Sequence, residues 1–200
     1  MLEQVEKISY LGSLITENAD CKIQDYRRMS MAQQVLTKLS PFWKSGTLSR
    51  QIKWRLVKAH VWPLAIYGSE SWTFDMELRR RLDSFENGCA RRVLRVPWTA
   101  HRTTEAIWND LVERKQLVID VAIRKLRYYG HILRHEVSSL EVAVLTGNVA
   151  GTQRKRGRPR RRRQDDISEW TNLQGHELSC TATDRSAWKR AIHNVAYTLT

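Results

Sequence analysis

What this 200-residue chain has little of excludes several classes of protein. Its three cysteines, Cys21, Cys89 and Cys180, are odd in number and far apart, which argues against a disulfide scaffold and for a reducing compartment. No apolar run approaches the length of a membrane span. The first residues lack the charged head and apolar core of a signal peptide. We therefore expect an intracellular protein without a membrane partner.

The patterns of an independent enzyme are also missing. His131 and His135 stand four apart, as do His176 and Cys180, but neither pair has the further ligands that tetrahedral zinc requires. The acidic pair Asp165–Asp166 opens a helical pattern, where carboxylates complement the helix dipole, so we interpret it as capping rather than as a magnesium site. No glycine-rich phosphate loop or nucleophile–base pattern is present. We expect no catalytic residue, no metal site and no cofactor.

Acidic residues are absent from residues 151–163, where basic residues are most concentrated. Arg154–Arg163 holds eight of the 34 Lys and Arg residues, in a chain of net charge +13. Such a run repels itself and needs a polyanion, usually nucleic-acid phosphate. Gly157 and Pro159 favour an extended strap over a helix. The expected contacts are Arg154, Lys155, Arg156, Arg158, Arg160, Arg161, Arg162 and Arg163.

Two alternatives remain for this run. It can be a solubilising tail or a nuclear address, and the second use makes the nucleus the favoured location over the cytoplasm. Within it, Arg156-Gly157-Arg158-Pro159 matches the core of an AT-hook, an extended segment that lies in a narrow A·T-rich minor groove.

Hydrophobic periodicity predicts a mainly α fold. A short β-hairpin is expected over Val5–Thr16, turning at Gly12-Ser13. A helix is expected with an apolar side from Ile23 to Trp43 and its end near Pro41. A second is expected from a Ser49 cap to Pro63, which would end or kink it. Further helices are expected over Leu78–Val96, Thr104–Val112, Gln116–His135 and Asp165–Leu173, and from a cap at Thr183 or Asp184 to Leu199. Residues 174–183 are expected to form a loop, and Gly130 indicates close packing inside its helix.

The clearest helix, Leu78–Val96, carries an apolar stripe that includes Cys89, which we interpret as a packing residue. The other sides of this helix are basic, and these side chains are expected either to contact phosphates or to form an ordinary solvated face. They are Arg79, Arg80, Arg81, Arg91, Arg92 and Arg95. The eight tryptophans are predicted to be core anchors, with base stacking as the alternative.

Six segments in order resemble the C-terminal part of a reverse transcriptase from a non-long-terminal-repeat (LINE-like) retrotransposon, which also carries an endonuclease. They are Tyr10–Thr16, Tyr67–Thr73, Arg81–Leu94, Leu126–Arg134, Lys155–Pro159 and Asp184–Trp188. The second reads Tyr-Gly-Ser-Glu-Ser-Trp-Thr and is similar to the family's Tyr-Gly-Ser-Glu-Thr-Trp-Thr. The fourth reads Leu-Arg-Tyr-Tyr-Gly-His-Ile-Leu-Arg and resembles Leu-Arg-Trp-Phe-Gly-His-Val-Leu-Arg.

This resemblance implies a division into five segments. Residues 1–18 would be a primer-grip-like hairpin at the end of the palm, with Tyr10, Leu11 and Gly12 near a primer terminus, and residues 19–98 a helical thumb that holds template and primer. The remaining segments would be a helical connection over 99–150, the basic extended strap over 151–163 and a small α-helical C-terminal region over 164–200.

The family's Tyr/Phe-Ala-Asp-Asp motif, which holds the catalytic magnesium, is absent from this chain. The resemblance therefore implies a nucleic-acid-binding fragment that does not polymerise alone. Its partners would be RNA, DNA or both, and through the hairpin the missing palm or another chain. The alternatives are a standalone AT-hook-like nuclear protein and a protein-interaction module.

Overall fold

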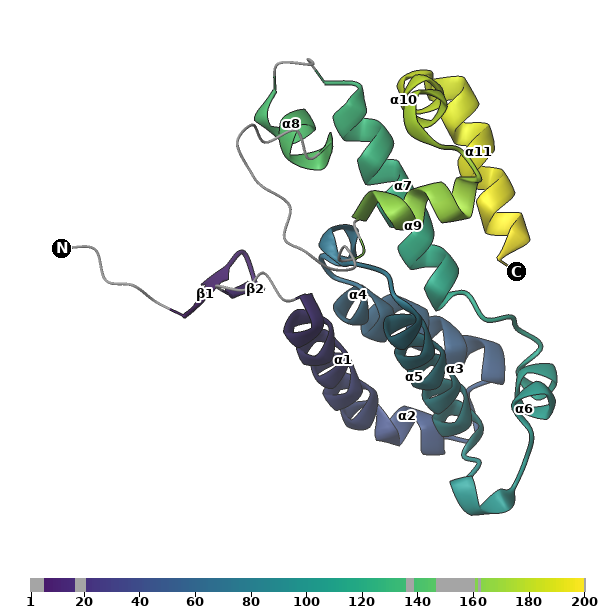
Figure 1. Cartoon of the computed structure of the whole chain (residues 1–200). Coiled ribbons are helices and arrows are strands. Elements are labelled where there is room, and N and C mark those ends of the chain that lie inside the picture. The colour runs from purple at the N-terminus through teal and green to yellow at the C-terminus, as the bar shows by residue number, and fades with distance from the viewer. Residues whose placement is uncertain (1–5, 17–20, 136–138, 147–160, 162, 200) are drawn as a thin grey trace. The chain divides into compact units, whose positions relative to one another are not determined.

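The computed structural model describes residues 6–16, 21–135, 139–146, 161 and 163–199 (Figure 1). Within these residues the fold is mainly α with one short antiparallel hairpin, as the sequence predicts. The chain forms two compact units. The first comprises residues 1–72 and 76–118, and the second comprises residues 73–75 and 119–200. The division into five segments is a functional one and stays a prediction.

The hairpin turns one residue earlier than the sequence analysis expects. Strand β1 (Lys7–Tyr10) pairs with β2 (Ser13–Thr16), and Tyr10 lies opposite Ser13. The connection is therefore Leu11-Gly12 rather than Gly12-Ser13. Both residues have positive φ, 48° and 75°. This is the conformation of the two-residue type I′ turn, whose twist matches that of paired strands, so the twist of the strands places the turn here.

Helices and helical turns make up the rest of the first unit. They are α1 (Cys21–Lys38), α2 (Ser40–Lys44), α3 (Arg50–Leu56), the π-helical turn η1 (Val57–Val61), α4 (Trp62–Ala65), the 3₁₀ turn η2 (Ser69–Ser71), α5 (Met76–Leu94), the 3₁₀ turn η3 (Trp98–Ala100) and α6 (Thr104–Leu111). Ser49 caps α3, as predicted, by accepting a hydrogen bond from the backbone N–H of Ile52. Pro63, expected to end or kink its helix, follows the π-helical turn in α4.

The helix expected from Ile23, with its end near Pro41, is two helices, because the chain breaks between α1 and α2. Pro41 has no N–H to continue the α1 ladder, and it takes a place in the first turn of α2 instead. Three polar ties join α1 to α5 in parallel: Lys22 to Glu77 at 2.5 Å, Asp25 to Arg81 at 2.9 Å and Thr37 to Arg92 at 2.7 Å.

A second correction concerns three apolar side chains. The apolar spacing of their helices predicts that Ile23, Tyr26 and Ile52 face inward, but they are 40%, 54% and 45% exposed. The buried side of α1 instead includes polar residues with partners. Gln24, for example, accepts a hydrogen bond from the backbone N–H of Leu14 at 2.9 Å. Apolar periodicity cannot identify a buried face whose residues are polar and paired.

Tryptophans are core anchors, as predicted. The ring of Trp54 meets Trp62 and Trp108 edge to face, with centroids 5.8 and 5.4 Å apart. At most 7% of each of six tryptophans is exposed: Trp43, Trp54, Trp62, Trp72, Trp108 and Trp188. Trp98, which is 80% exposed, is the clear exception.

The second unit is built from α7 (Leu117–Leu133), whose first residues belong to the first unit, α8 (Leu140–Thr146), α9 (Arg163–Thr171), α10 (Gly175–Thr183) and α11 (Arg185–Thr198). Its core joins Leu126 and Tyr129 of α7 to Ile167, Leu178 and Trp188. The loop expected over residues 174–183 is wrong, because α10 occupies that range. Leu178 of α10 is fully buried, so tertiary packing overrides the weak local signal there.

Two predictions for this unit are confirmed. Asp184 caps α11 by accepting a hydrogen bond from the N–H of Ser186 at 2.8 Å. Gly130 marks a close approach, because a Cβ at this position would lie 2.2 Å from Nε1 of Trp188. The absence of a side chain lets the indole donate a hydrogen bond to the carbonyl of Leu126 at 2.9 Å.

Candidate functional site

The tip of the hairpin is exposed but held in place. Tyr10 and Leu11 are 62% and 73% exposed. Arg28 of α1 donates a hydrogen bond to the carbonyl of Gly12, and its guanidinium lies 4.1 Å from the ring centre of Tyr67. The hydroxyl of Tyr67 donates to the carbonyl of Leu11 at 2.9 Å. These two side chains position the turn.

Sequence reasoning missed Arg28 as the residue that holds the turn. Burial lowers the pKa of the Arg28 guanidinium, the neighbouring Tyr67 opposes this shift only in part, and Arg27 adds to it. The sequence does contain a signal for Tyr67, because this residue begins the segment Tyr67–Thr73 that resembles the reverse transcriptase. Gly68, the next residue, adopts the left-handed φ of 72° that the turn after α4 requires.

The arginines of α5 fall into two groups. Arg81, Arg91 and Arg92 bind other parts of the first unit. Arg81 pairs with Asp25 at 2.9 Å and Glu77 at 3.3 Å, and only 16% of its side chain is exposed. Arg91 donates to the carbonyl of Arg102 at 2.8 Å, and Arg92 to the hydroxyl of Thr37. These contacts hold elements together.

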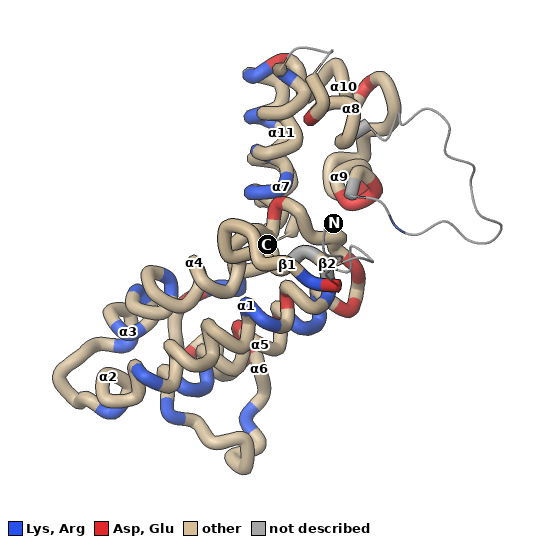
Figure 2. The backbone as a smooth tube through the Cα atoms, turned by 90° about the vertical axis from the view of Figure 1, so that its left-hand side faces the viewer, with Lys and Arg blue, Asp and Glu red and all other residues tan. Residues whose placement is uncertain are grey.

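The second group is Arg79, Arg80 and Arg95. Arg80 and Arg95 are exposed and Arg79 is half-buried. Within the part of the chain that the structure describes, their side chains make no hydrogen bond or ion pair. Lys and Arg also recur along the other helices of this unit (Figure 2). A phosphate could bind the second group without displacing an internal partner.

Arg95 also has an unusual backbone. It follows the last residue of α5 and has a φ of 57°. The N–H of Arg95 donates to the carbonyl of Arg92, and the N–H of Val96 donates to the carbonyl of Arg91. This is the Schellman ending, in which glycine is the usual residue. Val112 ends α6 in the same way, with φ of 56°. A side chain in this conformation costs about 1–2 kcal/mol.

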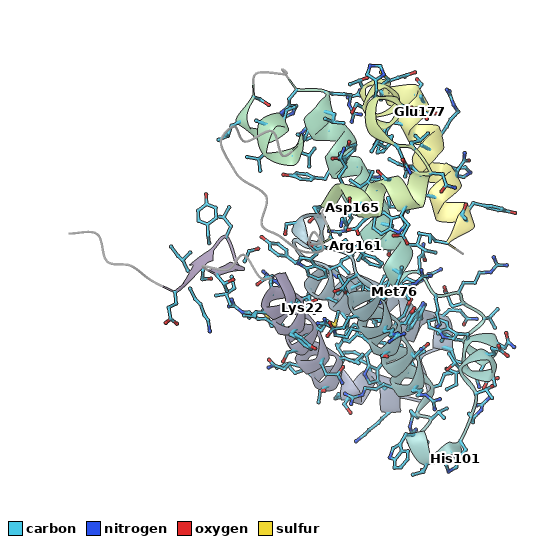
Figure 3. All side chains as sticks on the ribbon, in the orientation of Figure 1. Lys22, Met76, His101, Arg161, Asp165 and Glu177 are labelled. Carbon is cyan, nitrogen blue, oxygen red and sulfur yellow. The ribbon has the colours of Figure 1, made fainter. Side chains whose placement is uncertain are left out.

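Most of the basic strap lies outside the described residues. This applies to Arg154, Lys155, Arg156, Arg158, Arg160 and Arg162. The backbone of Arg163 begins α9. Arg161 is described, close to the start of α9 (Figure 3), and pairs with Asp166 at 2.7 Å and with Glu169. Partial burial would lower the pKa of Arg161, but these two carboxylates raise it above its ordinary value.

Asp166 corrects the interpretation of the acidic pair as helix capping. Its carboxylate is fully buried and receives three donors: Nζ of Lys125 at 2.5 Å, Nε of Arg161 at 2.7 Å and the N–H of Phe74 at 2.8 Å. Asp165, the other member, is exposed. Asp166 therefore joins three parts of the second unit and binds Arg161, the strap residue whose side chain the structure describes.

The histidines and cysteines considered as metal ligands form no metal site among the described residues. Among the described residues, no group of three or more His, Cys, Asp or Glu side chains is placed to hold a metal ion. The rings of His131 and His135 lie 4.6 Å apart, and Nδ1 of His135 lies 2.8 Å from Glu141. Burial raises the pKa of the Cys89 thiol to about 12, so this residue serves packing, as predicted.

No helix among the described residues has the length and apolarity of a membrane span. In comparisons with known proteins, the chain is 27% identical over 138 residues to an uncharacterized transposon-derived protein from Caenorhabditis elegans. The match covers 68% of this chain and 49% of that protein, so the chain spans about half the length of the relative. No family model matches the chain. No solved structure matches it either.

Proposed function

We propose that this chain is a nucleic-acid-binding, transposon-derived protein equivalent to the C-terminal part of a non-long-terminal-repeat retrotransposon reverse transcriptase. It grips template and primer, or target DNA, and leaves the polymerase reaction to a catalytic palm that its residues do not include. The similarity to a transposon-derived nematode protein supports the origin from a transposable element. The six segments that resemble the reverse transcriptase support the more specific assignment.

The observation that carries the proposal is the group Arg79, Arg80 and Arg95. In a unit where Arg81, Arg91 and Arg92 have internal partners, these three side chains have none among the described residues. Their positive charges can bind phosphates and release the counterions condensed on a nucleic acid, which favours binding. Contacts of this kind bind the sugar–phosphate backbone and carry no sequence preference.

The hairpin supports a role at the end of a bound strand. Tyr10 and Leu11 stay exposed although Arg28 and Tyr67 fix the turn between the strands. A fixed and exposed turn can position a primer terminus, and the exposed strand β1 can add to the sheet of a palm. We place no cofactor on this chain, since the magnesium of a parent polymerase would sit in the palm. We favour a nuclear location on account of Arg154–Arg163.

Binding to an RNA–DNA hybrid by the whole chain tests the proposal. We expect binding that weakens when residues 154–163 are deleted and, independently, when Arg80 is replaced by Ala. Lys58→Ala is the matched control, because Lys58 already pairs with Glu113 at 2.9 Å. Unchanged affinity in both the deletion and Arg80→Ala would contradict the proposal. So would nucleotide incorporation by the chain alone.

A second candidate function, that of an AT-hook protein, is supported by a specific motif. Arg156-Gly157-Arg158-Pro159 matches an AT-hook core, and a standalone AT-hook protein would prefer A·T-rich duplex and lose that preference on Arg158→Ala. A protein-interaction module would instead bind its partner with little dependence on salt.

A further inference from the structure

The loop between α5 and α6 presents a tryptophan that packing does not explain. Trp98 is 80% exposed, in a chain where six of the eight tryptophans are at most 7% exposed. The loop extends beyond the ends of the helices of its unit (Figure 1), and His101 lies at its outer edge (Figure 3). A large aromatic side chain left in water at such a position indicates a contact surface.

The loop is built to hold this position. Its two ends, Arg95 and His101, both have left-handed backbones, with φ of 57° and 47°. Pro97 fixes φ at −67° immediately before Trp98. The carbonyl of Arg102 accepts a hydrogen bond from Arg91 at 2.8 Å, which ties the end of the loop back to α5. Strained residues that persist in a tied loop are characteristic of functional sites.

The sequence through the loop carries charge of one sign, and the carboxylate that pairs with its Arg102 is Asp110 of α6. Residues 87–104 include four arginines and no acidic residue. Arg91 and Arg102 use their side chains to hold the loop. Arg95 is exposed beside it and its side chain makes no hydrogen bond or ion pair among the described residues, whereas the exposed Arg92 is bonded to Thr37. An aromatic face beside exposed arginines fits a nucleotide, whose base stacks while its phosphate binds the guanidinium.

We propose that Trp98 stacks on an unpaired base of single-stranded nucleic acid, with Arg95 on an adjacent phosphate. This inference rests on the proposed nucleic-acid binding. It adds that the ligand is single-stranded and that Trp98 selects it. The strand must be single, because a paired base in a duplex hides its face between its neighbours. The basic surroundings favour this ligand over the apolar surface of a protein partner.

The test is fluorescence anisotropy of the full chain with three probes: a labelled oligothymidylate, an abasic phosphodiester of the same length, and an RNA–DNA hybrid. We expect Trp98→Ala to weaken binding to oligothymidylate by roughly 5- to 150-fold, the range of base–aromatic stacking. Trp98→Phe should retain most of the affinity, since it keeps an aromatic face. Neither change should alter binding to the abasic strand or to the hybrid.

Tyr197→Ala is the matched control, because Tyr197 is 84% exposed on α11, in the second unit. It should bind all three probes as the native chain does. Circular dichroism of Trp98→Ala should match that of the native chain, since the side chain is exposed.

The outcomes separate the two proposals. If the native chain binds none of the probes, the proposed function fails and the stacking inference fails with it. If the native chain binds the hybrid and oligothymidylate, but Trp98→Ala binds oligothymidylate equally well, only the stacking inference is overturned. Loss of self-association in Trp98→Ala, measured by analytical ultracentrifugation with oligothymidylate binding intact, would assign Trp98 to a protein contact and also overturn it.

Discussion

Nζ of Lys125 lies 2.5 Å from a carboxylate oxygen of Asp166, and both side chains are almost completely removed from solvent, at 1% and 0% exposed. The two residues are 41 positions apart, on α7 and α9. The same carboxylate accepts the N–H of Phe74 and pairs with Arg161, at the end of the basic strap. The buried carboxylate of Asp166 therefore joins α7, α9 and the segment around Phe74, and it also binds Arg161 near the end of the strap.

Replacing Asp166 by Ala should destabilise the second unit by about 3–5 kcal/mol, because Lys125 would be left as a buried charge without its carboxylate. Urea unfolding followed by tryptophan fluorescence measures this loss. The exposed neighbour Asp165 provides the control, and Asp165→Asn should change the free energy of unfolding by roughly 0.5 kcal/mol or less. Equal effects of the two substitutions would show that the buried pair does not stabilise the fold.

Gly130→Ala should destabilise by about 1–3 kcal/mol, because the new Cβ would lie 2.2 Å from Nε1 of Trp188 and displace the indole from the carbonyl of Leu126. Gly88→Ala is the matched change in α5, where a Cβ meets nothing within 4 Å. It should stabilise by about 0.5–1 kcal/mol through helix propensity. Thermal unfolding measures both, and a gain in stability for Gly130→Ala would contradict the packing at this glycine.

Stability should fall as pH rises from about 4.5 to about 7, because of Glu86. Burial raises the pKa of its carboxyl to about 7, a shift enhanced by Asp83 and opposed by the N–H groups of Gln116 and Leu117 and by Lys115. In this range the unfolded chain ionises Glu86 while the folded chain keeps its proton, so unfolding releases a proton. The contribution is complete below pH 4.5 and is lost, by about 3 kcal/mol, once pH passes 7.

Urea unfolding of native and Glu86→Gln chains across this pH range isolates that contribution. The variant cannot ionise at this position and should show a decline smaller by about 3 kcal/mol. Parallel curves for the two chains would mean that Glu86 does not carry the dependence.

Arg95→Gly should stabilise the first unit by about 1 kcal/mol and weaken binding to nucleic acid. Glycine relieves the strain at φ of 57°, but the substitution removes a cation that has no internal partner among the described residues. Val112→Gly is the control, because it relieves the same strain at φ of 56° and removes no charge. It should stabilise equally and leave affinity unchanged, so a similar loss of affinity in both variants would count against a role for Arg95.

The sequence predicts the helical elements well where apolar spacing is regular. The helix Leu78–Val96 and the close packing at Gly130 both follow from local patterns, and the structure confirms them. The end of the first helix near Pro41 was expected, but the separate helix α2 was not, because the apolar spacing stays in phase through Trp43. α10 was missed because Leu178 and Ala182 become helical through contacts with distant residues, which local propensity does not contain.

The sequence predicts which residue types form the candidate site, but it does not predict which of them have internal partners. Sequence alone identifies the arginines of α5, but it cannot tell Arg81 from Arg80, because the partner of Arg81 is Asp25, 56 positions away. The role of Asp166 was also not predicted, because its partner Lys125 is 41 positions away and the neighbouring sequence suggests a helix cap. Trp98 is not distinguishable from the other tryptophans by composition, and only its 80% exposure sets it apart.

The salt dependence of binding to an RNA–DNA hybrid tests the central claim most directly. The affinity of the native chain should fall steeply as salt rises, with a log–log slope of about −0.9 for each phosphate neutralised on a B-form duplex and of similar size on a hybrid. Replacing Arg79, Arg80 and Arg95 together by Ala should make that slope shallower by up to about 3. A native chain whose affinity stays constant across the salt series would contradict the account.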